Sequence, residues 1–266
     1  MNTKNLKLFL LLFAVTISCS KDSENNTVVV EDENGNPIEV DTSANKKGVG
    51  DSANDLLSSN SFEKLVVEIL YVDNLQPTAS TLVNFKDFLE ARLNKPQGVE
   101  IVQRQVENES QEVYSIQDIR NIEDTHRSKF NEQGTITVSG LFLDGEYDQN
   151  TENGSVLGVA YRNTSFVIFG QTIREFSNQP LAPSLTTLES VVVNHEVGHL
   201  LGLVNAGTDM QTNHQDTAHG RHCTDDNCLM FWTAETGEGL LNMLTGGSIP
   251  SLDTFCIADL QANGGK

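Results

Sequence analysis

The stretch that decides the fold is Val191-Val192-Val193-Asn194-His195-Glu196-Val197-Gly198-His199-Leu200-Leu201-Gly202-Leu203. Its apolar residues, and two histidines four positions apart, predict a buried helix with both imidazoles on one face. Such a pair can share a metal ion, and Glu196 would then face a water on that ion, where a carboxylate can act as general base. The structural alternative is two core histidines satisfied by hydrogen bonds alone.

A regular alternation of strand and helix patterns precedes this helix. Five short segments rich in apolar and β-branched residues have the pattern of buried strands: 64–72, 99–106, 135–143, 155–161 and 165–169. Helical periodicity fills the two gaps before the third strand, over 78–93 and 115–130. Because parallel strands need long crossovers, this order predicts an α+β domain with an α/β-like N-terminal part and a twisted, mostly parallel five-stranded sheet.

The helix itself carries start and stop signals. Thr186 and Glu189 have the spacing of a capping box, and Gly202 is suited to a sharp turn after the helix. The chain beyond this turn is rich in glycine and polar residues until an apolar stretch over 252–260. We therefore expect a small, irregular C-terminal subdomain that ends in a short helix.

Charge restricts the possible partners of the protein. The 266-residue chain has 17 Lys and Arg against 37 Asp and Glu, which gives a formal net charge of −20. Such a chain repels phosphate groups, so nucleic-acid binding is excluded. The length allows one substantial domain, which we expect to be monomeric.

The N-terminus has the features of an export signal. Lys4 and Lys7 precede a short apolar run that ends in Thr16-Ile17-Ser18-Cys19, which resembles a bacterial lipobox. We expect residues 1–18 to be a lipoprotein signal peptide and Cys19 to carry the lipid. The acidic residues that follow resemble the export tag of surface lipoproteins, which implies an outer-membrane lipoprotein exposed at the cell surface. Residues 19–61 are polar and predict a flexible tether, and residues 62–266 the catalytic domain.

The helix motif resembles that of the metzincin metallopeptidases, H-E-x-x-H-x-x-G-x-x-H or Asp. His195, Glu196, His199 and Gly202 match it, but Asn205 stands where the third ligand belongs. A downstream segment, 222–230, has the form H-C-x4-C-x-M and resembles that of archaemetzincins, displaced here by an insertion over about 204–221.

The resemblance implies His222 as the third zinc ligand and Met230 as an apolar floor under the site. His219 and His214 remain alternatives for the third ligand.

The same resemblance implies a membrane-anchored zinc endopeptidase with one catalytic Zn²⁺ that acts on extracellular peptides or proteins. Glu196 would be the general base for a zinc-activated water, and strand 155–161 would hold an extended peptide by backbone pairing. The alternative function is a catalytically inactive zinc-binding surface lipoprotein that acts in binding or adhesion.

Another class of zinc peptidase, the gluzincins, takes a glutamate from a second helix as the third zinc ligand. Glu235 and Glu238 lie in a Thr- and Gly-rich turn, so neither is expected to bind.

Three cysteines remain besides Cys19. Archaemetzincins hold a second, structural zinc with the two cysteines of H-C-x4-C and a later C-x-x-C, but no C-x-x-C is present here. In an oxidising location we therefore expect a Cys223–Cys228 disulfide, with Cys228–Cys256 as the alternative.

The loop 144–150 is rich in oxygen ligands and can hold Ca²⁺ or another second metal, although a solvated loop is the better interpretation.

Overall fold

Five strands pair into one sheet, which confirms the predicted mixed α/β class with mostly parallel strands. In this computed structural model, which describes residues 26–31, 36–151, 154–244 and 247–266, the strand order is β4-β3-β6-β9-β8. The strands are β3 (Lys64–Val72), β4 (Val99–Val106), β6 (Thr135–Leu143), β8 (Gly158–Arg162) and β9 (Ser165–Phe169). All pair in parallel except β8, which is antiparallel to β9 and forms one edge.

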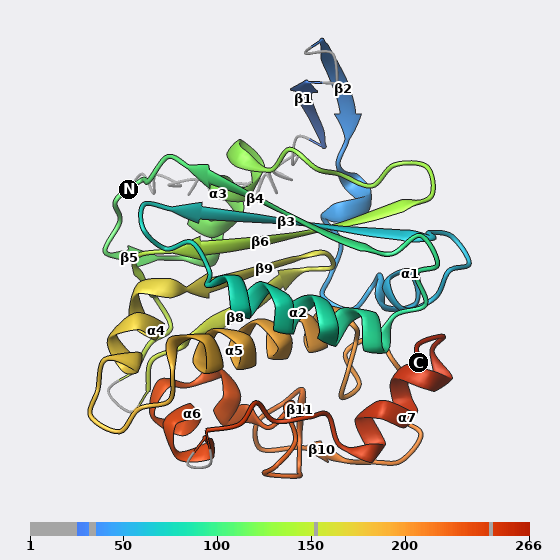
Figure 1. Cartoon of the computed structure of the whole chain (residues 1–266). Helices are drawn as coiled ribbons and strands as arrows, with labels where there is room; N and C mark the ends of the chain where they lie inside the picture. Colours follow the sequence, from blue (N-terminus) through green and yellow to red (C-terminus); the bar gives the residue numbers. More distant parts are fainter. Residues whose placement is uncertain (1–25, 32–35, 152–153, 245–246) are drawn as a thin grey trace, which may run out of the picture.

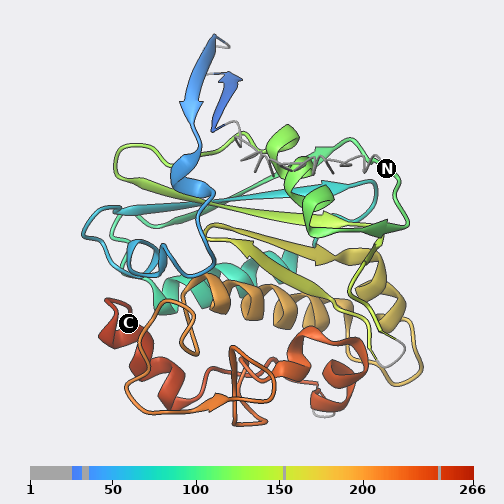
Figure 2. The same ribbon diagram turned by 180° about the vertical axis from the view of Figure 1, so that it is seen from behind.

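Helices cover both faces of the sheet. α2 (Ala79–Arg92) and α5 (Leu185–Leu200) lie side by side on one face, and α3 (Ile116–His126) lies on the other (Figures 1 and 2). The main core fills the space between the sheet and α2 and α5, where Phe85 meets Phe166 edge to face at 6.2 Å between ring centroids. α4 (Gly170–Ser177) leads from β9 towards α5.

The last quarter of the chain forms a small subdomain beneath α5 (Figure 1). Its elements are short: β10 (Gln215–Asp216), β11 (His222–Cys223), η2 (Trp232–Glu235), α6 (Gly237–Met243) and α7 (Thr254–Ala262). The terminal helix expected over 252–260 is therefore present as α7. Two further short strands, β5 (Val113–Tyr114) and β7 (Glu146–Tyr147), pair in parallel.

The polar segment expected to be a tether divides into two parts. β1 (Thr27–Glu31) and β2 (Pro37–Asp41) form a hairpin that projects away from the body (Figures 1 and 2). The chain after it is packed into the body, because Asn45 of η1 (Ser43–Asn45) is buried and Leu56 and Leu57 of α1 (Ala53–Leu57) belong to the core. The folded body therefore begins near residue 42 and not at residue 62, which corrects the predicted boundary.

Charged side chains hold this segment in place. Lys46 Nζ lies 3.0 Å from Asp124, which also pairs with Arg162 at 2.6 Å. Arg162 in turn reaches the buried Glu123 at 2.8 Å. Burial by itself raises the pKa of Asp124, but hydrogen bonds from Arg162 and Lys46 outweigh it and lower that pKa. Polar contacts of this kind leave no hydrophobic periodicity, so the sequence pattern did not reveal them.

The predicted signal peptide and Cys19 lie outside the described residues. Within the described part of the chain, no helix is both long enough and apolar enough to cross a membrane.

Candidate active site

The helix α5 that carries the motif is buried over most of its length. Ser184 caps its N-terminus by accepting a hydrogen bond from the Thr187 N–H at 3.1 Å. The predicted capping box of Thr186 and Glu189 is wrong. The Glu189 carboxylate instead accepts hydrogen bonds from a backbone N–H and a hydroxyl group at the start of α2, at 3.0 and 2.6 Å. A tertiary contact between two helices has replaced the local cap, and it fixes α5 against α2.

Two glycines shape the end of this helix. Gly202 has a φ of +75°, and a Cβ there would lie 2.6 Å from the backbone nitrogen of Thr208, so glycine is required for the turn. A Cβ on Gly198 would lie 2.3 Å from Met230 Sδ. Because Gly198 has no side chain, the fully buried Met230 packs directly against the helix at this position, which immediately precedes His199. This is the position in which the metzincin resemblance implies an apolar floor.

The structure brings three of the predicted residues together. The imidazole rings of His195, His199 and His222 lie 4.8, 5.2 and 5.1 Å apart between centroids. The Nε2 atoms of His195 and His199 are 3.1 Å apart. The insertion folds back so that β11 delivers His222 to the end of α5, which is the arrangement that a three-histidine metal site needs.

Backbone carbonyl groups orient two of these rings. His195 Nδ1 lies 2.7 Å from the Leu229 carbonyl oxygen, and His222 Nδ1 lies 2.6 Å from that of His219. A carbonyl oxygen only accepts, so Nδ1 carries the proton and the Nε2 lone pair of the neutral ring points into the site. His222 Nε2 is buried and has no hydrogen-bond partner. This fixed tautomer is the one that metal-binding histidines use.

The two alternative histidines lie elsewhere. His219 is exposed, with Nδ1 2.6 Å from Asp216 Oδ2 and its ring stacked on Trp232 at 4.3 Å between centroids. His214 is buried among the cysteines. Of the three candidates for the third ligand, only His222 lies beside the helix histidines.

Glu196 lies beside the histidines, where a general base is expected. It is 1% exposed, and its Oε2 accepts a hydrogen bond from the Ala160 N–H of β8 at 2.7 Å. Its Oε1 is buried without a partner. Burial, and then the nearby charge of Glu235, raises the pKa of Glu196 well above its ordinary value. One oxygen is thus fixed to the edge strand while the other is free to take a proton.

Glu235 is a site residue that the sequence interpretation rejected. Its Oε2 lies 3.7, 4.0 and 3.5 Å from the Nε2 atoms of His195, His199 and His222. Although burial alone would raise the pKa of Glu235, the facing imidazoles of His195 and His222 lower it strongly. The sequence contained one indication that Glu235 belongs to the site. Glu235 follows Met230 by only five residues, and Met230 packs against the end of α5 that carries the histidines. The side chain of Glu238, the other candidate, lies outside the described residues.

A cleft of about 330 Å³ opens onto these groups. β8 forms one wall with Val159 and Ala160, and Glu196, His222 and Glu235 form another. β8 pairs only with β9 among the described strands, so its outer edge is open to a further strand. The first part of the predicted edge strand is different, because Val156 bridges to Thr236. The β8 portion, 158–162, has no second strand partner within the ranges that the structure describes, although its Ala160 N–H donates to Glu196.

A second cluster of possible metal ligands lies in the C-terminal subdomain. One ligand atom from each of His214, Cys223, Asp253 and Cys256 lies within 4.8 Å of the others, and Cys228 Sγ is 3.7 Å from Cys256 Sγ. His214 Nδ1 is 3.3 Å from Cys223 Sγ and 4.0 Å from Cys256 Sγ. The His214 ring is held from behind, because its Nε2–H donates to Asp259 Oδ2 at 2.8 Å. Nδ1 of the neutral ring therefore presents its lone pair to the sulfur atoms.

The expected disulfide is absent. Cys223, Cys228 and Cys256 are buried free thiols, and the 3.7 Å between Cys228 and Cys256 is well beyond an S–S bond of about 2.05 Å. The physical reason is that Cys223 and Cys256 face His214, a residue of the insertion that the cysteine spacing could not place. Hydrogen bonds from the thiols of Cys223 and Cys256 lower the pKa of Cys228, which favours a thiolate in this cluster.

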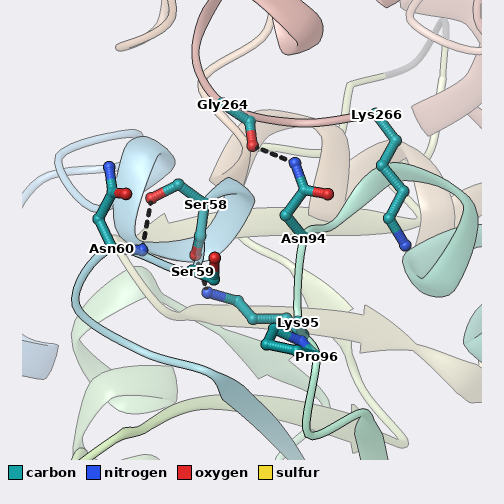
Figure 3. Close-up of a pocket in the computed structure, with 8 residues that line it drawn as sticks. All are labelled: Ser58, Ser59, Asn60, Asn94, Lys95, Pro96, Gly264 and Lys266. Atoms are coloured by element: carbon teal, nitrogen blue, oxygen red, sulfur yellow. Dashed lines mark hydrogen bonds between the residues drawn. The ribbon is translucent and has the colours of Figure 1, made fainter.

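Two other features contain no comparable chemistry. In the loop considered for calcium, the two oxygens of Asp144 accept hydrogen bonds from Tyr114 and Asn108 at 2.9 and 2.8 Å. The clusters above are the only groups of three or more possible metal ligands among the described residues, and neither includes this loop. A hollow of about 410 Å³ near the C-terminus is lined by Ser58, Lys95 and Lys266, among others, and contains none of the motif residues (Figure 3).

The fold of this chain is similar to those of several proteins of known structure. No family profile matches the chain, and no curated protein matches it. An archaemetzincin from Methanopyrus kandleri is similar over 77% of this chain and 96% of its own, at 19% identity and a TM-score of 0.49. A zinc-dependent peptidase from Methanocorpusculum labreanum is similar over 73% and 99%, at 14% identity and a TM-score of 0.46. Metalloproteinase-II from Bacteroides fragilis is similar over 89% and 65%, at 12% identity and a TM-score of 0.43. Because these TM-scores lie below 0.5, the functional argument rests on the residues of this chain.

Proposed function

We propose that this protein is a zinc-dependent endopeptidase. The observation that carries the proposal is the convergence of His195, His199 and His222 on one point, beside the unpartnered Oε1 of Glu196. The Nε2 lone pairs of neutral His195 and His222 point into the same space, and a cation there would bind both. Three imidazoles in a buried setting are a donor set that suits zinc, so the residues fit the metal.

The chain would contribute three things to hydrolysis. Zinc, when bound by these imidazoles, would act as a Lewis acid that lowers the pKa of water towards about 7 and polarises a substrate carbonyl. Glu196 would take a proton at Oε1 and return it to the leaving amine, while the Ala160 N–H holds Oε2 in place. Burial raises the pKa of Glu196, which makes its carboxylate a stronger proton acceptor than an exposed one. The outer edge of β8 would align an extended peptide by backbone hydrogen bonds.

The experiment that tests the proposal is a pH profile of peptide hydrolysis with zinc content measured at each pH. Imidazoles must be neutral to bind metal. Burial lowers the pKa of His199, whereas Glu235 outweighs burial at His222 and raises its pKa, so His222 takes a proton at a higher pH than His199 does. We expect hydrolysis at pH 7–8, and a joint fall of rate and bound zinc below about pH 6.5. Absence of cleavage of a broad peptide library by the zinc-loaded protein would favour the inactive binding protein instead.

We also propose that His214 and the three thiols hold a second, structural zinc. A Zn–S distance of about 2.3 Å gives sulfur atoms about 3.8 Å apart around a tetrahedral ion, close to the 3.7 Å between Cys228 and Cys256. Asp259 would orient the His214 ring, as carboxylates do behind many zinc-bound histidines. We favour Cys228 over Asp253 as the remaining ligand because thiolates bind zinc more strongly than carboxylates in such sites.

This second site predicts two zinc ions per chain and three thiols that react with alkylating reagents only after chelation. Replacing His214 with Ala should remove one zinc, whereas His219→Ala, a change at an exposed histidine, should leave both. The measurements are metal analysis and mass spectrometry of the alkylated protein. One zinc per chain together with an intramolecular disulfide would refute the second site.

A further inference from the structure

Glu235 lies in front of the three histidines but has no part in the proposed mechanism. Its Oε2 is 3.5–4.0 Å from their Nε2 atoms. Zinc binds imidazole nitrogen and carboxylate oxygen at similar distances, about 2.0–2.2 Å, so ligand atoms around a tetrahedral ion are separated by about 3.3–3.5 Å. With the three imidazoles at three corners, this oxygen lies close to the fourth.

The backbone of Glu235 is fixed by contacts, and its side chain is partly exposed. The Glu235 carbonyl oxygen accepts a hydrogen bond from the Leu157 N–H at 2.9 Å, and the next residue, Thr236, bridges to Val156. The side chain is 28% exposed and lines the cleft. It can therefore reach the histidines or turn outward into the cleft without a change in the chain path.

We propose that Glu235 is a fourth protein ligand of the zinc, which closes the site at rest and is displaced when a substrate carbonyl enters. This inference rests on the proposed function, because a peptidase needs an open position on its metal. Structural zinc sites are closed by four protein ligands, whereas catalytic sites use three. A displaceable fourth ligand would keep water and other small ligands off the metal until a peptide enters the cleft.

The two carboxylates of the site differ in burial and in how firmly they are held, as expected if Glu196 is the general base and Glu235 the displaceable ligand. Glu196 is 1% exposed and is held by the Ala160 N–H. Glu235 is more exposed, and its oxygen faces the imidazoles across 3.5 Å or more. Glu196 is thus fixed for proton transfer, and Glu235 is the one that can leave.

The test replaces Glu235 with Gln, which keeps the shape of the side chain but offers a neutral amide, a poor zinc ligand. The probe is acetohydroxamate, a small chelating anion that needs the fourth position. We expect Glu235→Gln to weaken zinc binding by about 10–100-fold in chelator competition. We also expect the zinc-loaded variant to bind acetohydroxamate about tenfold more tightly, because no ligand has to be displaced first.

A matched control separates coordination from a change in charge. Asp226→Asn removes one negative charge from an exposed position of the same subdomain and should change neither affinity. The cysteine cluster is the same in all three proteins, so a difference in zinc competition comes from the histidine site. Unchanged zinc affinity or unchanged acetohydroxamate affinity in Glu235→Gln would overturn the proposal. Both affinities are measured without catalysis, so they test the role of Glu235 even if no form of the protein cleaves peptides. A complete lack of cleavage would refute the proposed function and not the role of Glu235 as a ligand.

Discussion

Replacing Glu196 with Gln is expected to lower kcat/KM for peptide hydrolysis by about 10²–10⁴-fold. The amide cannot accept a proton from water, yet it can keep a contact between its oxygen and the Ala160 N–H. The histidines do not depend on Glu196 for their orientation, since backbone carbonyls hold His195 and His222. Zinc content should therefore be unchanged, and the measurements are initial rates together with metal analysis of the same samples.

Glu189→Gln is the matched control for this variant. Glu189 is also a buried glutamate of α5, but its carboxylate faces the start of α2 and lies outside the cleft. We expect this variant to lose stability and to keep the kcat/KM of the unmodified protein. Equal losses of activity in the two variants would mean that any change in a buried carboxylate of α5 disturbs the site, and Glu196 would then have no special role.

Replacing His222 with Ala is expected to weaken zinc binding by at least about 100-fold and to abolish hydrolysis at low zinc. Loss of an outer-shell partner of a zinc ligand already costs about 10–100-fold in affinity, and loss of a ligand costs more. His219→Ala is the comparison, because His219 was an alternative for the same role and lies three residues earlier in the chain. Zinc affinity is measured by chelator competition at pH 7–8.

The His219 carbonyl oxygen accepts the hydrogen bond from His222 Nδ1. That carbonyl belongs to the backbone and stays in the His219→Ala variant, so its zinc affinity should fall little. A result in which His219→Ala loses zinc and His222→Ala keeps it would show that the insertion folds differently from the structure.

The fold could be predicted where its determinants are local. Apolar strands and periodic helices appear in the sequence as patterns, and β3, β4 and β6 begin and end where these patterns do. The packing of residues 42–61 could not be predicted in the same way, because it depends on partners such as Asp124, 78 residues from Lys46. The capping box failed for a related reason. Glu189 has the correct spacing for a cap, but a buried hydrogen bond to α2 is available only in the folded protein.

The candidate site shows the same division. His195, Glu196 and His199 lie on one helix, so their spacing alone places them together. His222 required the resemblance to a family, because an insertion separates it from the helix. Glu235 reaches the histidines because the chain after Met230 returns to pair with Val156, a contact between distant segments. For the same reason, no cysteine spacing could show that His214 would enter the thiol cluster.

The central claim is that the three-histidine site holds a zinc that is required for peptide cleavage. It is tested most directly by assaying a broad peptide library with the purified protein before chelation, after chelation, and after zinc is restored. We predict cleavage that disappears with the metal and returns with zinc, while Glu196→Gln carried through the same cycle rebinds zinc and stays inactive. Full zinc occupancy of the histidine site without cleavage of any peptide, or cleavage that continues after the metal has been removed, would contradict the account.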